Sequence, residues 1–169
     1  MIDSTTLAAL ADFPPRLEAF YSAIPAAYRN WRPDSWDGIP SEPFTAIEQI
    51  CHVRDVELDG YHERFRRALT ESHPRLANLD GERLAHERSY GTADGTTVFD
   101  ELGRARAMTL AMIAGFNEAQ LERTAEFDGV TVTLRGLVHL LCSHDQQHLA
   151  GLQWLAARID GSRHAGRQI

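Results

Sequence analysis

The sequence predicts an all-α protein, a four-helix bundle with a long crossover between the second and third helices. Four long stretches carry apolar residues three or four positions apart, which is the spacing of an amphipathic helix. One connection between them, residues 73–95, is long and irregular. The 169 residues, of which 43% are hydrophobic, suffice for one well-buried core but not for two, so we expect a single domain over residues 1–169.

The first helix is expected over residues 5–29. Its apolar positions are Leu7, Leu10, Phe13, Leu17, Phe20, Tyr21 and Ile24. Pro14 and Pro15 interrupt this pattern. Because a proline inside a helix removes a backbone hydrogen bond and clashes with the preceding turn, we expect a kink or a fresh start near Asp12. Residues 30–43, NWRPDSWDGIPSEP, predict a loop.

The second helix is expected to begin near Ser41 or Thr45 and to end at residue 72. If it begins early, Ser41 is the cap, Glu42 suits the positive end of the helix, and Pro43 is tolerated in the first turn. Its apolar stripe consists of Ile47, Cys51, Leu58, Tyr61, Phe65 and Leu69. The crossover that follows would let the second and third helices run side by side in the same direction.

The third helix is predicted over residues 96–124 and the fourth over residues 134–159. The third carries the apolar residues Val98, Leu102, Met108, Met112, Ile113 and Phe116, for which a place in the core is expected. Between the two helices, Val130 and Val132 predict a short extended connector. Thr133 is then the expected cap of the fourth helix.

The fourth helix places two histidines on its apolar face. The inward positions are Leu137, Leu141, His144, His148, Leu152, Leu155 and Ile159. Because residues four apart differ by only about 40° around a helix axis, His144 and His148 point into the same volume, one turn apart. Two neutral imidazoles placed in this way can share one divalent metal ion. The alternative is a pair of histidines that are packed in the core with satisfied nitrogens, or that face solvent.

A metal site also requires a third ligand from another helix. His139 is turned to the opposite side of the fourth helix, His73 and His86 lie in the crossover, and His164 lies in the polar tail. These four are therefore set aside. The remaining candidates, His52 and His62, both belong to the second helix. Periodicity does not decide between them.

Three segments together resemble one known family. NWRP at residues 30–33, ICHVRDVE at residues 50–57 and SHDQQHLAGLQWL at residues 143–155 resemble the DinB and YfiT-like family of metal-binding four-helix bundles, which is distinct from the similarly named DNA polymerase. The resemblance covers nearly the whole chain. It implies that the metal ligands are His52, His144 and His148, with Asp55 or Asp145 also able to approach the ion.

Three imidazole ligands imply a particular chemistry. They leave coordination positions open, and an ion with neutral ligands keeps its full charge, which lowers the pKa of a bound water or thiol. Zinc or nickel is expected, and iron or manganese also accept imidazole. The resemblance implies either a transferase or isomerase that uses low-molecular-weight thiols such as bacillithiol, mycothiol or glutathione, or a hydrolase. Our first hypothesis is a metal-dependent thiol S-transferase, or a related detoxifying enzyme, acting on a small molecule.

Other polar and aromatic residues have two interpretations each. Carboxylates that can orient the imidazoles are Asp55, Glu57 and Asp145, although an ordinary solvated charge is preferred for Glu57. Arginines that can hold a substrate carboxylate, or instead pair with surface acids, are Arg54, Arg104 and Arg106. Trp31 and Trp36 can form a wall of the pocket or pack against the end of the bundle.

The second hypothesis is a protein without enzymatic activity. Such a bundle binds metal for stability, or forms a homodimer through a helix face that carries Met108, Met112 and Phe116. A structural metal ion is saturated by protein ligands, so a fourth protein ligand in place of water would favour this hypothesis.

Charge and cysteine content exclude several classes of partner. The chain has 17 basic and 24 acidic residues, a net charge of −7, so we expect no nucleic-acid partner. The sequence shows neither a secretory signal nor a membrane-spanning segment, which predicts a cytoplasmic protein with no membrane partner. Cys51 and Cys142 are far apart in apolar patterns and are expected to be buried thiols.

Overall fold

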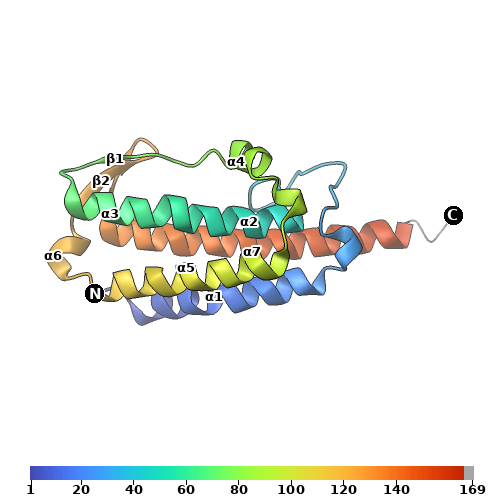
Figure 1. Cartoon of the computed structure of the whole chain (residues 1–169), viewed down its shortest axis with the longest axis horizontal. Coiled ribbons are helices and arrows are strands. Elements are labelled where there is room, and N and C mark those ends of the chain that lie inside the picture. Colours follow the sequence, from blue (N-terminus) through green and yellow to red (C-terminus); the bar gives the residue numbers. More distant parts are fainter. Residues whose placement is uncertain (166–169) are drawn as a thin grey trace.

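Four long helical arms form the bundle in the computed structural model, which describes residues 1–165 (Figure 1). The arms are α1 (Ser4–Ala23), α2 (Ala46–Asp55) with its continuations, α5 (Gly95–Ala114) and α7 (Leu134–Ala165). The π-helical segment η2 (Val56–Tyr61) and α3 (His62–Thr70) continue α2 without a break. The predicted all-α four-helix bundle is confirmed.

The direction of the arms follows from the long crossover. Figure 1 shows that α1 and α7 run one way, whereas the α2–η2–α3 arm and α5 both run the other way. The crossover holds β1 (Arg75–Leu76), α4 (Gly81–Glu87) and the 3-10 turn η3 (Tyr90–Thr92). It returns the chain to the end of the bundle where α2 began, so the second and third arms are parallel, as predicted.

A small sheet lies at one end of the bundle, near α3 and α6 (Glu118–Leu121) (Figure 1). Strands β2 (Thr124–Phe127) and β3 (Val130–Thr133) form an antiparallel hairpin, and β1 pairs in parallel with β2. The extended connector at Val130 and Val132 is therefore a strand. The third helix is shorter than predicted, because α5 ends at Ala114 and Asn117 caps the separate α6 with a capping box.

Helix α1 passes through both prolines without a break, so of the two expectations, a kink or a fresh start near Asp12, the fresh start is wrong. Pro14 has no N–H to donate to the carbonyl of Leu10, four residues earlier. The Arg106 Nη1 donates to that carbonyl instead, at 2.7 Å. A buried side chain from α5 thus supplies the hydrogen bond that the proline removes, and buried Phe13 and Leu17 continue the apolar face of the helix.

The second arm begins at the later of the two expected positions. Thr45 is the N-cap of α2, and its hydroxyl accepts from the backbone N–H of Glu48, whose carboxylate accepts in return from the N–H of Thr45. Ser41 and Glu42 therefore lie in the loop before the helix. The 3-10 turn η1 (Ala26–Tyr28) ends α1 at the other side of this loop.

The π-helical segment changes which residues of the second arm face the core. A π-helix holds more residues per turn than an α-helix, so the apolar stripe shifts by one position. Val56 and Glu57 are buried, whereas Leu58, expected in the core, is 38% exposed. Met108 on α5 was also expected in the core and is 56% exposed.

The core consists of two apolar clusters. The cluster around the start of α2 includes Phe13, Leu17, Ile47, Ile50, Leu102, Leu152 and Leu155, and the cluster around α3 includes Leu10, Phe65, Ile113, Leu134, Leu137 and Leu141. His144 and His148 lie on α7 between the leucines of the two clusters. Over residues 1–165, every helix is too short or too polar to cross a membrane.

Candidate metal centre

Four side chains converge between α2 and α7. Glu42, His52, His144 and His148 each offer one ligand atom, and these atoms all lie within 4.8 Å of one another. The Nε2 atom of His144 is 3.4 Å from Nε2 of His52 and 3.1 Å from Nε2 of His148. The carboxylate of Glu42 approaches Nε2 of His52 at 3.4 Å and Nε2 of His148 at 3.1 Å.

These separations fit a metal ion. Ligand atoms that bind a tetrahedral zinc ion at about 2.0–2.1 Å lie roughly 3.3 Å from one another. Two Nε2–Nε2 distances and two Nε2–carboxylate distances are 3.1–3.4 Å, and the remaining pairs of ligand atoms lie within 4.8 Å. Three imidazoles and one carboxylate are also ligands that zinc and other divalent transition metals accept.

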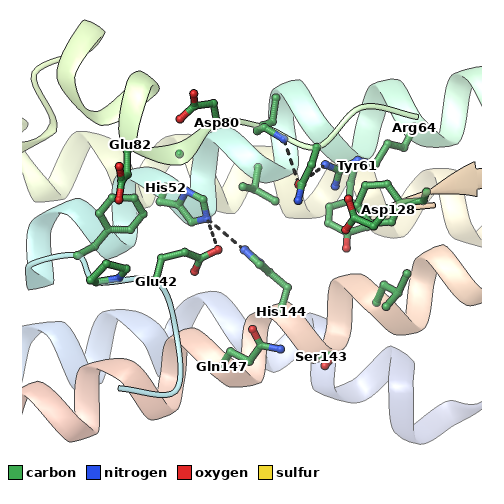
Figure 2. A pocket seen from close by; sticks show the side chains of 18 residues that line it. Glu42, His52, Tyr61, Arg64, Asp80, Glu82, Asp128, Ser143, His144 and Gln147 are labelled. Carbon is green, nitrogen blue, oxygen red and sulfur yellow. Dashed lines mark hydrogen bonds and ion pairs between the residues drawn. The ribbon is translucent and has the colours of Figure 1, made fainter. Parts of the chain in front are cut away.

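Different elements supply the four donors. His52 projects from α2 and is 3% exposed, whereas His144 and the fully buried His148 project from one face of α7. Glu42 reaches in from the loop before α2, and Figure 2 shows its carboxylate beside the rings of His52 and His144. The structure thus brings together all three predicted histidines. His62, the alternative on the second arm, lies elsewhere and contacts Thr109 at 2.9 Å.

Glu42 was missed as a site residue by the sequence analysis, which assigned it to the start of the second helix. It lies outside the helix, so helical periodicity contains no information about its direction. The capping box formed by Thr45 and Glu48 is the sequence signal that could have placed Glu42 correctly. It starts the helix after Thr45, so Glu42 lies in the preceding loop.

Gln49 determines how His148 presents its ring. The Gln49 Nε2 donates to the Ser41 hydroxyl at 2.7 Å, with longer contacts to the carbonyls of Glu42 and Phe44. Its amide oxygen therefore faces Nδ1 of His148. An amide oxygen only accepts hydrogen bonds, so Nδ1 carries the ring proton, and Nε2 directs a lone pair toward the other donors.

The three carboxylates that were candidates to orient the rings, Asp55, Glu57 and Asp145, have other partners. Asp55 accepts hydrogen bonds from Tyr90 and Arg54. Glu57 and Asp145 bind Arg106. The Nδ1 atoms of His52 and His144 have no hydrogen-bond partner within the described part of the chain. Instead, Gly81 of α4 packs against the ring of His52, where a Cβ atom would come within 2.9 Å.

Burial favours neutral rings at His144 and His148, although the Glu42 carboxylate by itself raises the pKa of both. Burial lowers the pKa of His144 well below its usual value, and the neighbouring imidazoles and Arg64 lower it further. The pKa of His148 is also lowered, mainly by burial. Burial by itself would raise the pKa of Glu42, but its contacts with His148 and His52 outweigh this effect and lower it. Neutral imidazoles and a carboxylate are the forms that bind metal.

The donors open onto a pocket of about 450 Å³. Glu42, His52 and His144 line its wall (Figure 2), whereas the fully buried His148 does not line it. The other charged residues that line the pocket are Arg64, Asp80, Glu82 and Asp128. The volume is within the roughly 300–1,000 Å³ typical of small-molecule sites.

Arg106 and Glu57, expected at the surface, form a buried ionic cluster with Asp145. Arg106 donates to both oxygens of Glu57 at 2.7 and 2.8 Å and to both oxygens of Asp145 at 2.7 and 3.1 Å. The Thr109 hydroxyl also donates to Glu57 at 2.6 Å. Arg106 therefore has no free donor for a substrate. Of the other two predicted arginines, Arg54 pairs with Asp55 and Glu101, and Arg104 is exposed.

The two tryptophans serve the bundle rather than the pocket. Trp36 stacks on Trp154 of α7, with ring centroids 6.1 Å apart, and both Trp31 and Trp36 pack against the core. Neither is among the residues that line the pocket. Both cysteines are free thiols, as expected, but only Cys51 is buried, whereas Cys142 is partly buried.

The fold and the donor cluster together describe a helical bundle that carries a candidate metal centre between two of its helices. A model of the DinB superfamily matches residues 9–152, so the chain belongs to this superfamily. Among solved structures, YfiT from Bacillus subtilis matches with a TM-score of 0.81 and 18% sequence identity, over 95% of this chain and 91% of that protein. YfiT is described as a probable metal-dependent hydrolase with an unusual four-helix bundle topology. Among curated protein sequences, none matches this chain significantly.

Proposed function

We propose that this chain is a metal-dependent enzyme that activates a small nucleophile, either water or a low-molecular-weight thiol, against a small-molecule substrate. The observation that carries the proposal is the position of the donors. Three histidines and a carboxylate converge at ligand spacing, and three of the four line the wall of an open pocket. A metal ion held only for stability needs no such access.

The proposed ligands are His52, His144 and His148, with Glu42 as a fourth donor. Zinc or nickel suits this set best, and iron and manganese are the alternatives. A divalent ion bound there would lower the pKa of a coordinated water or thiol toward neutrality. Gln49 keeps the lone pair of His148 Nε2 directed toward the other three donors.

A thiol nucleophile would have to come from outside the chain. Neither Cys51 nor Cys142 lines the pocket, and burial raises the pKa of the Cys51 thiol to about 12. Water is the first candidate, and the description of YfiT as a probable metal-dependent hydrolase supports it. A low-molecular-weight thiol in the same position would make the chain an S-transferase.

The proposal is tested by metal content and turnover. Protein purified without chelator is expected to hold about one zinc or nickel ion per chain. A His144→Ala, His148→Ala double variant should hold none, whereas the exposed His164→Ala control should behave as wild type. The loaded protein is then assayed with activated esters and amides, and with bacillithiol, mycothiol and glutathione plus an electrophile. Absence of stoichiometric metal in the wild type, after titration with zinc, nickel and manganese, would refute the proposal.

Glu42 itself favours a second candidate function, a metal ion held for stability. A carboxylate in the fourth position saturates a tetrahedral site with protein ligands. However, the Glu42 side chain is 44% exposed and comes from a loop, so it can yield its position to a nucleophile. In an enzyme, Glu42→Gln should change turnover while the three histidines retain metal. In a structural site, the loaded protein is inactive toward every substrate and Glu42→Gln lowers only metal affinity and stability.

Dimerisation is part of this second candidate. Met108 is 56% exposed, but Met112 and Phe116 are partly buried against the core, so the apolar face is narrower than the sequence suggested. Light scattering of wild type and a Met108→Glu variant tests whether this face joins two copies. A homodimer that the substitution separates into monomers supports an interface there.

A further inference from the structure

Arg64 is a buried guanidinium whose charge has no close counter-ion. Its side chain is 3% exposed. Nε and Nη2 donate to the carbonyl of Ala77 at 3.3 and 3.2 Å, and Nη2 also donates to the amide oxygen of Asn78 at 3.3 Å. These acceptors are neutral, and no carboxylate of residues 1–165 forms an ion pair with Arg64. Buried Arg106, in contrast, has two carboxylate partners.

Two aromatic rings and a glycine fix this guanidinium in place. Its Cζ atom lies 4.7 Å from the centre of the Tyr61 ring and 4.5 Å from that of Phe127. Both distances are in the range of cation–π attraction, which leaves the positive charge intact. A Cβ atom at Gly60 would lie 3.3 Å from Nη1, so the glycine leaves room for the group. Arg64 is therefore held rigidly, unlike a mobile surface arginine.

The pocket of the metal-ligand cluster also reaches Arg64. Figure 2 shows Arg64 and Tyr61 at one end of the pocket and His52 and His144 toward the other. Asp128 lies at the same end as Arg64, but it is exposed and the two form no ion pair. Water screens the charge of an exposed carboxylate far more than that of a buried guanidinium. A small molecule in the pocket can thus meet an unneutralised positive charge.

We propose that Arg64 binds a carboxylate group of the substrate and thereby places the reacting group of the substrate beside the metal-ligand cluster. Because Nε and Nη2 already donate to Ala77 and Asn78, the Nη1 group is the donor that would form a charge-assisted hydrogen bond with the carboxylate. The acids Asp80, Glu82 and Asp128 around the pocket repel a doubly charged phosphate more strongly than a singly charged carboxylate. The substrate class is therefore a small monocarboxylate. This inference rests on the proposed function for its reaction, but not for the binding of the carboxylate.

The test measures carboxylate binding in metal-free protein, so that the ion cannot act as the anion site. The probes are phenylacetate, 3-phenylpropanoate and hexanoate, each compared with its neutral amide and with inorganic phosphate in ligand-observed NMR titrations. We expect at least one carboxylate to bind about tenfold more tightly than its amide and than phosphate. Arg64→Gln should remove this preference, whereas Arg66→Gln, on the exposed side of α3, should keep it.

Several results would overturn the inference. They are equal binding of carboxylate and amide, tighter binding of phosphate, an unchanged preference in Arg64→Gln, or no carboxylate binding up to about 20 mM. If Arg64→Gln does not fold, Arg64→Lys keeps the charge without the guanidinium, and the amide comparison needs no variant. Zinc content is measured in parallel. Carboxylate binding without zinc binding would refute only the proposed function. Zinc binding without carboxylate binding would refute only the role of Arg64.

Discussion

Gln49 is predicted to act on the proposed metal centre through His148 rather than as a ligand. Its amide oxygen holds the proton of His148 on Nδ1. Replacing such a partner of a ligating histidine typically costs about 10–100-fold in metal affinity. We predict a loss of this size for zinc in Gln49→Leu, measured by competition with a chromophoric chelator. Gln146→Leu, exposed on α7 beside the site, should retain wild-type affinity, and equal affinity of the two variants would contradict this role for Gln49.

Cys51 is predicted to be unreactive in the folded protein. Burial raises its pKa from 9.0 to about 12, so at pH 8 the reactive thiolate falls from about one in ten to about one in ten thousand. Iodoacetamide at pH 8 should leave Cys51 unmodified in native protein and alkylate it in urea, as read by peptide mass spectrometry. As the pH rises above 9, the unfolded chain loses this proton before the folded chain does. The free energy of unfolding is therefore predicted to decrease in this range. Rapid native alkylation of Cys51 would contradict both expectations.

At the scale of the helices, Arg106 joins all four arms of the bundle. It binds the Leu10 carbonyl of α1, Glu57 of η2 and Asp145 of α7 from its own position on α5. Removing one partner from a buried ionic cluster leaves charges without compensation, which costs about 3–5 kcal/mol. We predict a loss of this size in the free energy of unfolding for Arg106→Leu, measured by urea denaturation. Exposed Arg104→Leu is the control, and similar unfolding midpoints for the two variants would contradict this role.

Gly151 shows how closely α7 packs against the loop that carries Glu42. A Cβ atom there would come within 2.4 Å of the Ser41 hydroxyl and 3.1 Å of Nε2 of Gln49. Alanine in place of glycine in a helix normally stabilises by about 1 kcal/mol. We predict instead that Gly151→Ala lowers both the Tm and zinc affinity, because it displaces the two side chains that orient His148.

Gly161→Ala is the matched control on the same helix, since a Cβ atom there meets nothing within 4 Å. It should leave zinc affinity unchanged and raise the Tm slightly. If the Gly151→Ala protein is as stable as the Gly161→Ala protein, the Ser41 and Gln49 side chains move aside without loss of stability, and the prediction is wrong.

For the whole molecule, metal binding is predicted to stabilise the fold. The donors converge only when the loop, α2 and α7 are assembled, so the unfolded chain binds an ion more weakly. A ligand at about 1,000 times its Kd stabilises the folded state by about 4 kcal/mol. Zinc should raise the Tm of the wild type, and excess chelator should reverse the rise. The His144→Ala, His148→Ala variant should not respond, and a similar rise in that variant would place the zinc elsewhere.

Much of the architecture was predictable from local pattern. The spacing of apolar residues predicted four helical arms, and Thr133 was correctly expected as the cap of α7, where its hydroxyl accepts from the N–H of Gly136 at 3.0 Å. The length of the crossover predicted that the second and third arms are parallel. These features depend on residues a few positions apart, or on the reach of the chain, and both can be read directly from the sequence.

The spacing of His144 and His148 places them on one face of a helix, because helical geometry sets their separation. Assembly of the bundle sets what meets them: Glu42 from a loop, Gln49 behind His148, and a pocket that extends to Arg64. It also decided that Glu57 is buried and Leu58 exposed, because the π-helical turn shifts the second arm by one residue. The spacing of residues along a helix sets the direction in which each side chain points. Which residues of loops and other helices contact that side chain depends on the assembled bundle, in which buried polar and charged groups must find partners.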